Sequence, residues 1–232
     1  EISESSSDFP DDMDNTRPER PFRLWIARHG NREDFVDPGW KLSAERPHDP
    51  PLSEDGFEQA AELAERLAGE DIGHVYASPF LRTMQTATPV AEALGLPIRV
   101  EPGAAEWLNE DWFPHGADPL PPEELSRQFP GVDADYEPLV ELEFPETWDA
   151  CLRRYSVTGR LLSEMHEENV LVVGHGATII GMVQGLLQDP GMAVQWDLAS
   201  VTLLERQGRN WQLLLQSDTA HLSSGTMGGR LV

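Results

Sequence analysis

Two hydrophobic runs in this chain each lead directly into a His-Gly pair, and this repeated pattern constrains the fold more than any other feature. The run 22–27 precedes Arg28-His29-Gly30, and the run 169–173 leads into Gly174-His175-Gly176. The second run is continuous, as in strands buried on both faces of a parallel sheet. Parallel strands end at a common edge, so we expect both imidazoles at one sheet edge, where open α/β folds bind ligands.

Strand-like and helix-like segments alternate through the rest of the chain. Helical spacing of apolar residues and capping signals predict four helices, over about 53–69, 79–94, 147–162 and 177–187. Further strands are predicted at 74–77, 98–100, 201–205 and 211–216, the last two joined by a turn at 207–210. Repeated βα units indicate the α/β class, as a three-layer α/β/α sandwich around a mostly parallel sheet.

Three segments depart from this pattern. Residues 1–20 are rich in Ser, Asp and Pro and predict a disordered acidic leader, whereas 217–232 is expected to be a flexible tail. The segment 106–145 is rich in proline and acidic residues but also carries aromatic residues, namely Trp107, Trp112, Phe113, Phe129 and Tyr136. A long aromatic-bearing loop in a compact domain is usually functional, so we expect a cap over the strand ends within one domain at 21–216.

The composition excludes several classes of partner. With 41 acidic and 17 basic residues the formal net charge is −24, a field that repels nucleic acids and anionic membranes. No apolar run is long enough to span a bilayer, no signal peptide is evident, and Cys151 is the only cysteine, so we expect a cytoplasmic protein without a cysteine-based metal cage. Lys41 is the only lysine; a GC-rich genome that favours arginine codons and a high-salt habitat both stay open as explanations.

The residues at the predicted sheet edge suit phosphate chemistry. Arginine offers a planar fork of donors for phosphate oxygens, and histidine can act as a nucleophile. Ser78-Pro79 leads from a predicted strand into a helix that carries Arg82 in or near its first turn. Arg28, Arg32 and Arg82 are therefore expected to converge with the two histidines on one anion site inside a strongly negative protein.

In these motifs the chain resembles the histidine phosphatase superfamily, with its phosphoglycerate mutase-like fold, over nearly all of 21–216. The matching pieces are Arg28-His29-Gly30, the block from Ser78-Pro79 through Arg82 to Gln85-Thr86-Ala87, and Gly174-His175-Gly176. Within the superfamily, the segments 74–79 and 99–107, together with Arg32 and Trp40, are most similar to the Sts/TULA and ecdysteroid-phosphate phosphatase branch.

The resemblance implies a mechanism. His29 would become a phosphohistidine, while Arg28, Arg32, Arg82 and His175 would bind substrate through the non-bridging oxygens. Glu106 matches the acid that protonates the leaving oxygen, and we expect burial near phosphate to raise its pKa. No metal and no cofactor is implied, because the arginines supply the positive charge.

The function predicted is therefore a metal-independent phosphomonoesterase acting on a small-molecule or peptide phosphomonoester. Trp107, Trp112 and Phe113, close to Glu106, favour an aromatic or hydrophobic leaving group. Phosphoglycerate mutase-type transfer and a phosphate-recognising module without turnover stay open, although Asn31-Arg32 after the first motif weakens the mutase alternative. The oligomeric state is also open, with a homodimer as one option. Of the other histidines, which are interpreted as structural or surface residues, His115 is the one that the cap could bring into the site.

Overall fold

The computed structural model describes residues 20–117 and 119–225, and its six strands form one sheet. The strand order is β3-β2-β4-β1-β5-β6, in which β1 to β4 run parallel and β5 pairs antiparallel with β1 and β6. The mostly parallel sheet is as predicted. The strands are β1 (Phe22–Arg28), β2 (His74–Ala77), β3 (Ile98–Val100), β4 (Val170–Gly174), β5 (Val201–Gln207) and β6 (Asn210–Asp218).

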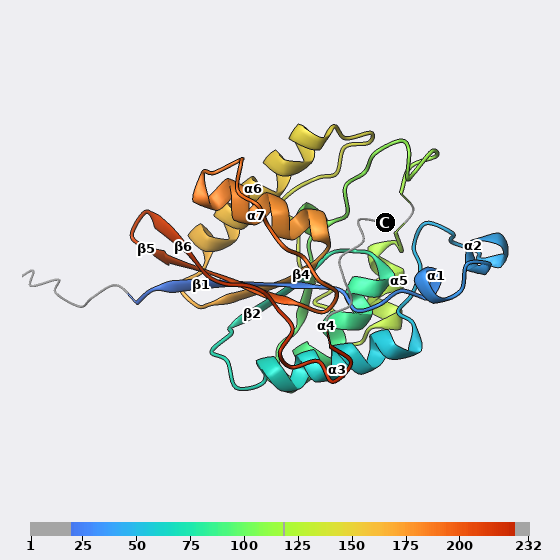
Figure 1. The fold of residues 1–232 in the computed structure, drawn as a ribbon, viewed down its shortest axis with the longest axis horizontal. Helices are drawn as coiled ribbons and strands as arrows, with labels where there is room; N and C mark the ends of the chain where they lie inside the picture. Colours follow the sequence, from blue (N-terminus) through green and yellow to red (C-terminus); the bar gives the residue numbers. More distant parts are fainter. Residues whose placement is uncertain (1–19, 118, 226–232) are drawn as a thin grey trace, which may run out of the picture.

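Helices cover both faces of this sheet, which confirms the three-layer architecture (Figure 1). One face carries α3 (Glu54–Leu67) and α4 (Leu81–Leu94), and the other carries α6 (Trp148–Met165) and α7 (Gly176–Leu187). Alternate side chains of β1 serve the two layers: Trp25 packs in the α3/α4 core, whereas Leu24 packs in the α6/α7 core. Every residue of β4 is buried, as its continuous apolar run predicts.

The helix ends follow from local chemistry that the sequence displays. The Ser53 side chain accepts the N–H of Gly56 at the start of α3, and Thr147 accepts the N–H of Ala150 at the start of α6. Helix α4 ends at Gly95, whose φ of 68° lies in the left-handed region that glycine adopts without strain. These are the boundary signals from which the four long helices were predicted.

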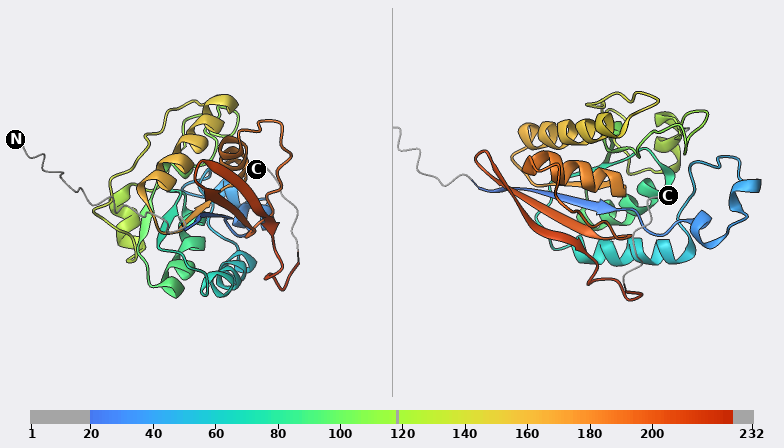
Figure 2. Two further views of the ribbon diagram at one scale, coloured as in Figure 1. Left: turned by 90° about the vertical axis from the view of Figure 1, so that its left-hand side faces the viewer. Right: turned by 45° about the horizontal axis from the view of Figure 1, so that its top comes forward.

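The remaining helices are short and lack an apolar period. Two of them, α1 (Glu33–Val36) and α2 (Trp40–Ser43), form an arm that projects beyond the carboxyl end of β1 (Figure 2). The 3₁₀ turn η1 (Pro102–Ala104) follows β3, and α5 (Pro122–Gln128) lies within the predicted cap segment. An isolated bridge from Val132 to Ile98 ties the later part of that segment to the edge of the sheet.

The two predicted terminal segments are described only in part. The predicted leader lies outside the described residues except for Arg20, as does 226–232 of the predicted tail. The described part of the tail begins inside β6, which continues to Asp218, and Leu222 beyond it is buried. Among the described residues, no helix is both long and apolar enough to cross a membrane.

Candidate active site

The parallel pairing of β1 with β4 brings the two His-Gly motifs together. Arg28 is in register with Gly174, and the N–H of His29 donates to the carbonyl of Gly174 over 3.1 Å. The rings of His29 and His175 meet edge to face with centroids 5.4 Å apart, and both are fully buried. The predicted convergence of the imidazoles therefore follows from the sheet itself.

His29 is fixed in one tautomer by its own loop. Its Nδ1 lies 2.7 Å from the carbonyl oxygen of Gly30, which can only accept, so Nδ1 carries the hydrogen and Nε2 carries the lone pair. Nε2 is buried and has no hydrogen-bond partner among the described residues. Burial, together with the charges of Arg82 and Arg28, holds the pKa of His29 well below its ordinary value. The result is a neutral imidazole with an available Nε2, which is the form of a nucleophile.

The loop after His29 packs directly on helix α3. A Cβ on Gly30 would meet the carbonyl oxygen of Gly56 at 2.6 Å, so only glycine permits this approach. The Gly30 N–H donates to Thr86 Oγ1 over 3.1 Å, and the Asn31 N–H donates to Gln59 Oε1 over 2.8 Å. Thr86, part of the third sequence motif, thus supports the loop from α4.

Arg82 joins the other predicted residues. From the first turn of α4, its Nη2 lies 3.3 Å from Glu106 Oε2 and 3.1 Å from His175 Nδ1. The same residue keeps Nε and Nη1 buried without a hydrogen-bond partner in the described part of the chain, Asp49 Oδ1 being 3.9 Å from Nη1. Buried donors of this kind are normally satisfied, so they indicate a missing acceptor such as an anion.

The other two arginines are held by different partners. Arg28 is buried and donates from Nη1 to the carbonyl of Trp196 over 2.7 Å. Burial lowers its pKa to about 10, and the nearby charges of Arg32 and Arg82 act in the same direction. Arg32 binds the Asp34 carboxylate through two hydrogen bonds of 2.9 and 2.6 Å. Together with Arg82, these two residues place three guanidinium groups in one region of the site.

The pKa of Glu106 differs from its predicted direction. Burial raises its pKa, but the contacts with His175 and Arg82 and the Trp107 N–H outweigh burial and hold the pKa below its usual range. The predicted elevation is therefore wrong for the protein alone. Burial lowers the pKa of His175 itself to about 4, so this imidazole is neutral at physiological pH, and its Nε2 contacts Ser78 Oγ at 2.8 Å.

A small cavity adjoins Arg82 and Arg32. It is lined by residues from the segment 32–48, from the start of the cap segment and from α4, namely Arg32, Lys41, Pro47, His48, Arg82, Trp112 and Phe113. His48 packs against Phe113 with ring centroids 5.8 Å apart. His115, the histidine that we expected the cap to bring in, is exposed and is not among these residues. Sequence reasoning missed His48 and Lys41 as cavity residues, because the segment 32–48 that carries them has no periodic pattern of apolar residues.

The chain belongs to the histidine phosphatase superfamily (branch 1), whose family model matches residues 24–219. This membership confirms the resemblance on which the sequence interpretation rested. The geometry agrees with it, since the two His-Gly motifs and Arg82 are the parts that meet at the sheet edge. Among the described residues, no group of three or more His, Cys, Asp or Glu side chains could hold a metal ion.

Several relatives are similar over most of the chain. The ecdysteroid-phosphate phosphatase of Bombyx mori is 30% identical over 80% of this chain and 33% of its own length, and the ubiquitin-associated and SH3 domain-containing protein B of Mus musculus is 31% identical over 67% and 31%. The transcription factor tau 55 kDa subunit of Saccharomyces cerevisiae is 29% identical over 87% of this chain and 56% of its own length. The chain thus spans about a third to just over half of these relatives.

The fold of this chain is also similar to that of a solved structure. The ecdysone phosphate phosphatase EPPase from Bombyx mori, crystallised with tungstate, superposes with a TM-score of 0.70 at 26% identity, covering 91% of this chain and 98% of that one. Phosphatases thus stand among the relatives of this chain by sequence and by structure.

Proposed function

We propose that the protein is a metal-independent phosphomonoesterase that acts through a phosphohistidine on His29. The observation that carries the proposal is the set of buried nitrogen atoms without partners among the described residues, His29 Nε2 together with Arg82 Nε and Nη1. A phosphoryl group placed between them meets a nucleophile and the donors for its oxygens at once. The tungstate bound in the related EPPase structure, an oxyanion of similar shape to phosphate, is consistent with this assignment.

In the first step, His29 Nε2 attacks phosphorus in line with the ester oxygen. A P–N bond forms, the P–O bond to the leaving group breaks, and a proton passes from the Glu106 carboxyl to the departing oxygen. Arg28, Arg32, Arg82 and His175 hold the non-bridging oxygens while negative charge shifts toward the leaving group. The positive charge that a metal would supply comes here from the guanidinium groups.

In the second step, water attacks the phosphohistidine. A proton of the water passes to the Glu106 carboxylate as the new P–O bond forms. The P–N bond breaks, its electron pair returns to His29 Nε2, and inorganic phosphate leaves. Glu106 must be protonated for the first step, although its pKa is low in the protein alone. We expect bound substrate to raise the pKa of Glu106, because the negative charge of the phosphate dianion lies beside the carboxylate and its oxygens occupy the donors of Arg82.

The leaving group is proposed to be aromatic or hydrophobic. Trp112 and Phe113 line the same cavity as Arg82, and His48 adds a third ring. Initial rates with 4-nitrophenyl phosphate, a phosphotyrosine peptide, a steroid phosphate and a sugar bisphosphate test this. We expect the first three to be turned over with higher kcat/KM. A preference for the bisphosphate, or exchange of label between its positions, would favour the mutase alternative.

Replacing the nucleophile tests the phosphohistidine. We expect His29→Ala to lower kcat on the order of 10⁴-fold or more and to abolish an acid-labile phosphoenzyme trapped by rapid quench. His115→Ala serves as the matched control, since that histidine is exposed and outside the cavity. Undiminished trapping in His29→Ala would refute the assignment, and loss of activity after chelation by EDTA would refute metal independence.

A further inference from the structure

The segment that presents Glu106 is held along its backbone by side chains of the neighbouring helices. Each of the four carbonyl groups of residues 103–106 accepts a hydrogen bond from α6 or α7. The bonds are Arg154 Nη1 to Gly103 and Ala105 (both 3.0 Å), Arg154 Nη2 to Glu106 (3.1 Å), Tyr155 Oη to Ala105 (2.6 Å) and Thr178 Oγ1 to Ala104 (3.1 Å). One guanidinium group thus supplies three of the five bonds.

Arg154 is itself fixed by Glu146. Two parallel hydrogen bonds of 2.6 and 2.7 Å join its Nε and Nη2 to the two carboxylate oxygens of Glu146. Glu146 in turn accepts the N–H of Leu108 over 3.3 Å, and its backbone carbonyl accepts Trp107 Nε1 over 3.1 Å. The Arg154–Glu146 pair therefore forms hydrogen bonds with the chain both before Glu106, at residues 103 and 105, and after it, at Trp107 and Leu108.

This ion pair is buried, with both side chains only 5% exposed. Buried ion pairs are a poor source of stability, because desolvation offsets most of their attraction. The guanidinium group of this pair donates to the carbonyls of one short segment, and these hydrogen bonds hold that segment in place.

Glu106 needs this backbone support because its carboxylate shares partners with the substrate. Its Oε2 lies 3.3 Å from both Arg82 Nη2 and His175 Nδ1, the groups proposed to hold the phosphate. When phosphate takes these contacts, the carboxylate keeps the 3.1 Å hydrogen bond from the Trp107 N–H, which belongs to the same backbone segment. Its position is then set by the backbone from which it extends.

We propose that Arg154 is a positioning residue for the proton transfer by Glu106, paired with Glu146 and acting through the carbonyls of residues 103–106. The inference rests on the proposed function, in which Glu106 protonates the leaving oxygen. A proton donor must come within hydrogen-bond reach of that oxygen, and a displacement of about 1 Å costs about 10²-fold in rate. Only the planar fork of arginine reaches three carbonyls and a carboxylate together.

The test is Arg154→Lys, assayed by kcat/KM with two substrates. Lysine keeps the charge beside Glu146 but cannot make the fork. With an alkyl phosphate, whose alkoxide leaves only when protonated, we expect a loss of about 30- to 100-fold. With 4-nitrophenyl phosphate, whose phenolate leaves without a proton, we expect a change of less than about threefold. Arg153→Lys, the exposed neighbour on the same helix, is the matched control and should change neither.

A double-mutant cycle with Glu106→Gln separates positioning from a general structural effect. If Arg154 acts through Glu106, Arg154→Lys causes no further loss with the alkyl phosphate in the Glu106→Gln background. Additive losses, or equal losses with both substrates, would overturn the proposal. A Glu106→Gln enzyme that does not distinguish the two substrates would overturn the acid assignment as well, which identifies failure of the proposed function separately.

Tyr155→Phe provides a second variant that removes a single hydroxyl. It deletes the 2.6 Å hydrogen bond to the Ala105 carbonyl and leaves the ion pair in place. We expect the same selectivity at smaller size, a loss of about threefold to tenfold with the alkyl phosphate alone. Equal loss with both substrates in this variant would count against the proposal even if Arg154→Lys failed to fold.

Discussion

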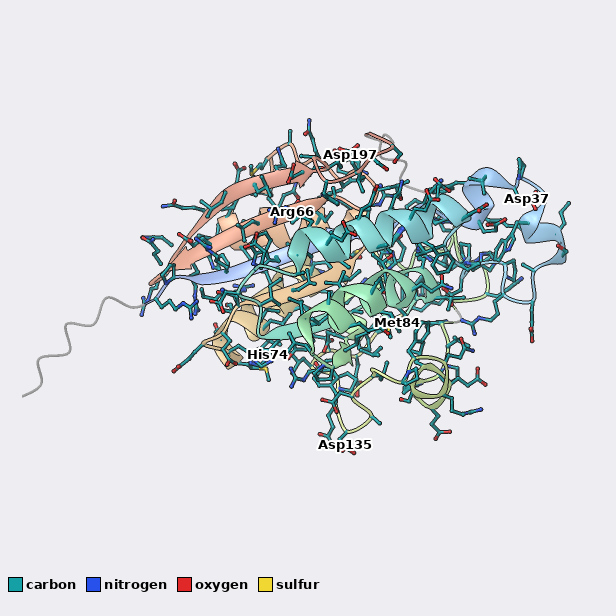
Figure 3. All side chains as sticks on the ribbon, turned by 90° about the horizontal axis from the view of Figure 1, so that it is seen from below. Asp37, Arg66, His74, Met84, Asp135 and Asp197 are labelled. Atoms are coloured by element: carbon teal, nitrogen blue, oxygen red, sulfur yellow. The ribbon has the colours of Figure 1, made fainter. Side chains whose placement is uncertain are left out.

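The two ends of the sheet each carry a cluster of histidine and arginine, but only one of them is built as a site. At the amino end of β2, His74 stacks on His166 with ring centroids 3.7 Å apart. His74 Nδ1 contacts Arg99 Nη1 at 2.7 Å, its Nε2 lies 2.9 Å from Glu168, and Tyr76 Oη lies 2.7 Å from His166 Nε2. Figure 3 shows His74 far from Asp37, which marks the arm at the other end.

The difference lies in what the polar atoms contact. Both ring nitrogens of His74 have partners, whereas at the carboxyl end His29 Nε2 and two Arg82 nitrogens have none in the described part of the chain. Residue types alone therefore do not distinguish the clusters. Buried donors and lone pairs held in place without a protein partner do, since such groups are costly unless a ligand satisfies them.

The largest contrast is expected from replacing one arginine at each end. Arg82→Lys removes the guanidinium group, whose Nη2 contacts both His175 and Glu106, so kcat/KM should fall about 10²- to 10³-fold. Arg99→Lys at the amino end should change it less than twofold. Steady-state kinetics with 4-nitrophenyl phosphate measure both. Comparable losses in the two variants would break the distinction between the clusters.

A smaller effect is expected from Ser78→Ala. This substitution removes the hydroxyl that lies 2.8 Å from His175 Nε2, so that ring nitrogen loses its polar contact. We expect kcat to fall about tenfold, because the imidazole is then less well oriented toward phosphate. Thr88→Ala, which removes a hydroxyl bonded to the α4 backbone, is the control and should leave kcat unchanged. Equal kcat in Ser78→Ala and wild type would show that His175 needs no such support.

The amino-end cluster should influence acid stability instead of rate. Burial lowers the pKa of His166 to about 4 and lowers that of His74. Below pH 6.5 these two histidines bind protons in the unfolded chain but stay neutral in the native protein. The free energy of unfolding therefore decreases as the pH falls from about 6.5 to 4. In His74→Gln/His166→Gln we expect this fall to be smaller by about 1 kcal/mol after allowance for solvent screening, with kcat within twofold of wild type.

Urea unfolding at several pH values between 4 and 7 measures this effect. The buried site histidines, His29 and His175, also have lowered pKa values, so part of the acid sensitivity remains in the double variant. A double variant as acid-sensitive as wild type would show that the amino-end pair does not contribute.

Much of the fold was predictable because its elements are dictated locally. The buried run of β4, the Ser53 and Thr147 caps and the left-handed Gly95 each follow from a few neighbouring residues. The arm helices α1 and α2 were not predicted, because short helices held by tertiary contacts leave no apolar period.

The candidate site was predictable in membership but not in its electrostatics. The tautomer of His29 depends on the Gly30 carbonyl, and the low pKa of Glu106 depends on contacts with Arg82 and His175. Arg154 is a signal that sequence reasoning missed. It lies three residues after Cys151 and four before Thr158, both of which are buried on the same helix, whereas its neighbour Arg153 is exposed.

The register between β1 and β4 has a consequence for motion. Because the last residues of the two strands, Arg28 and Gly174, are paired, the residue after each strand is a site histidine, and the separation of the two histidines is set by the hydrogen bonds of the central strands. Amides of central strands exchange with solvent last, whereas those of short surface helices exchange early. The two imidazoles are therefore anchored in the slowest-opening part of the molecule, and the arm of α1 and α2 is free to fluctuate without altering their spacing.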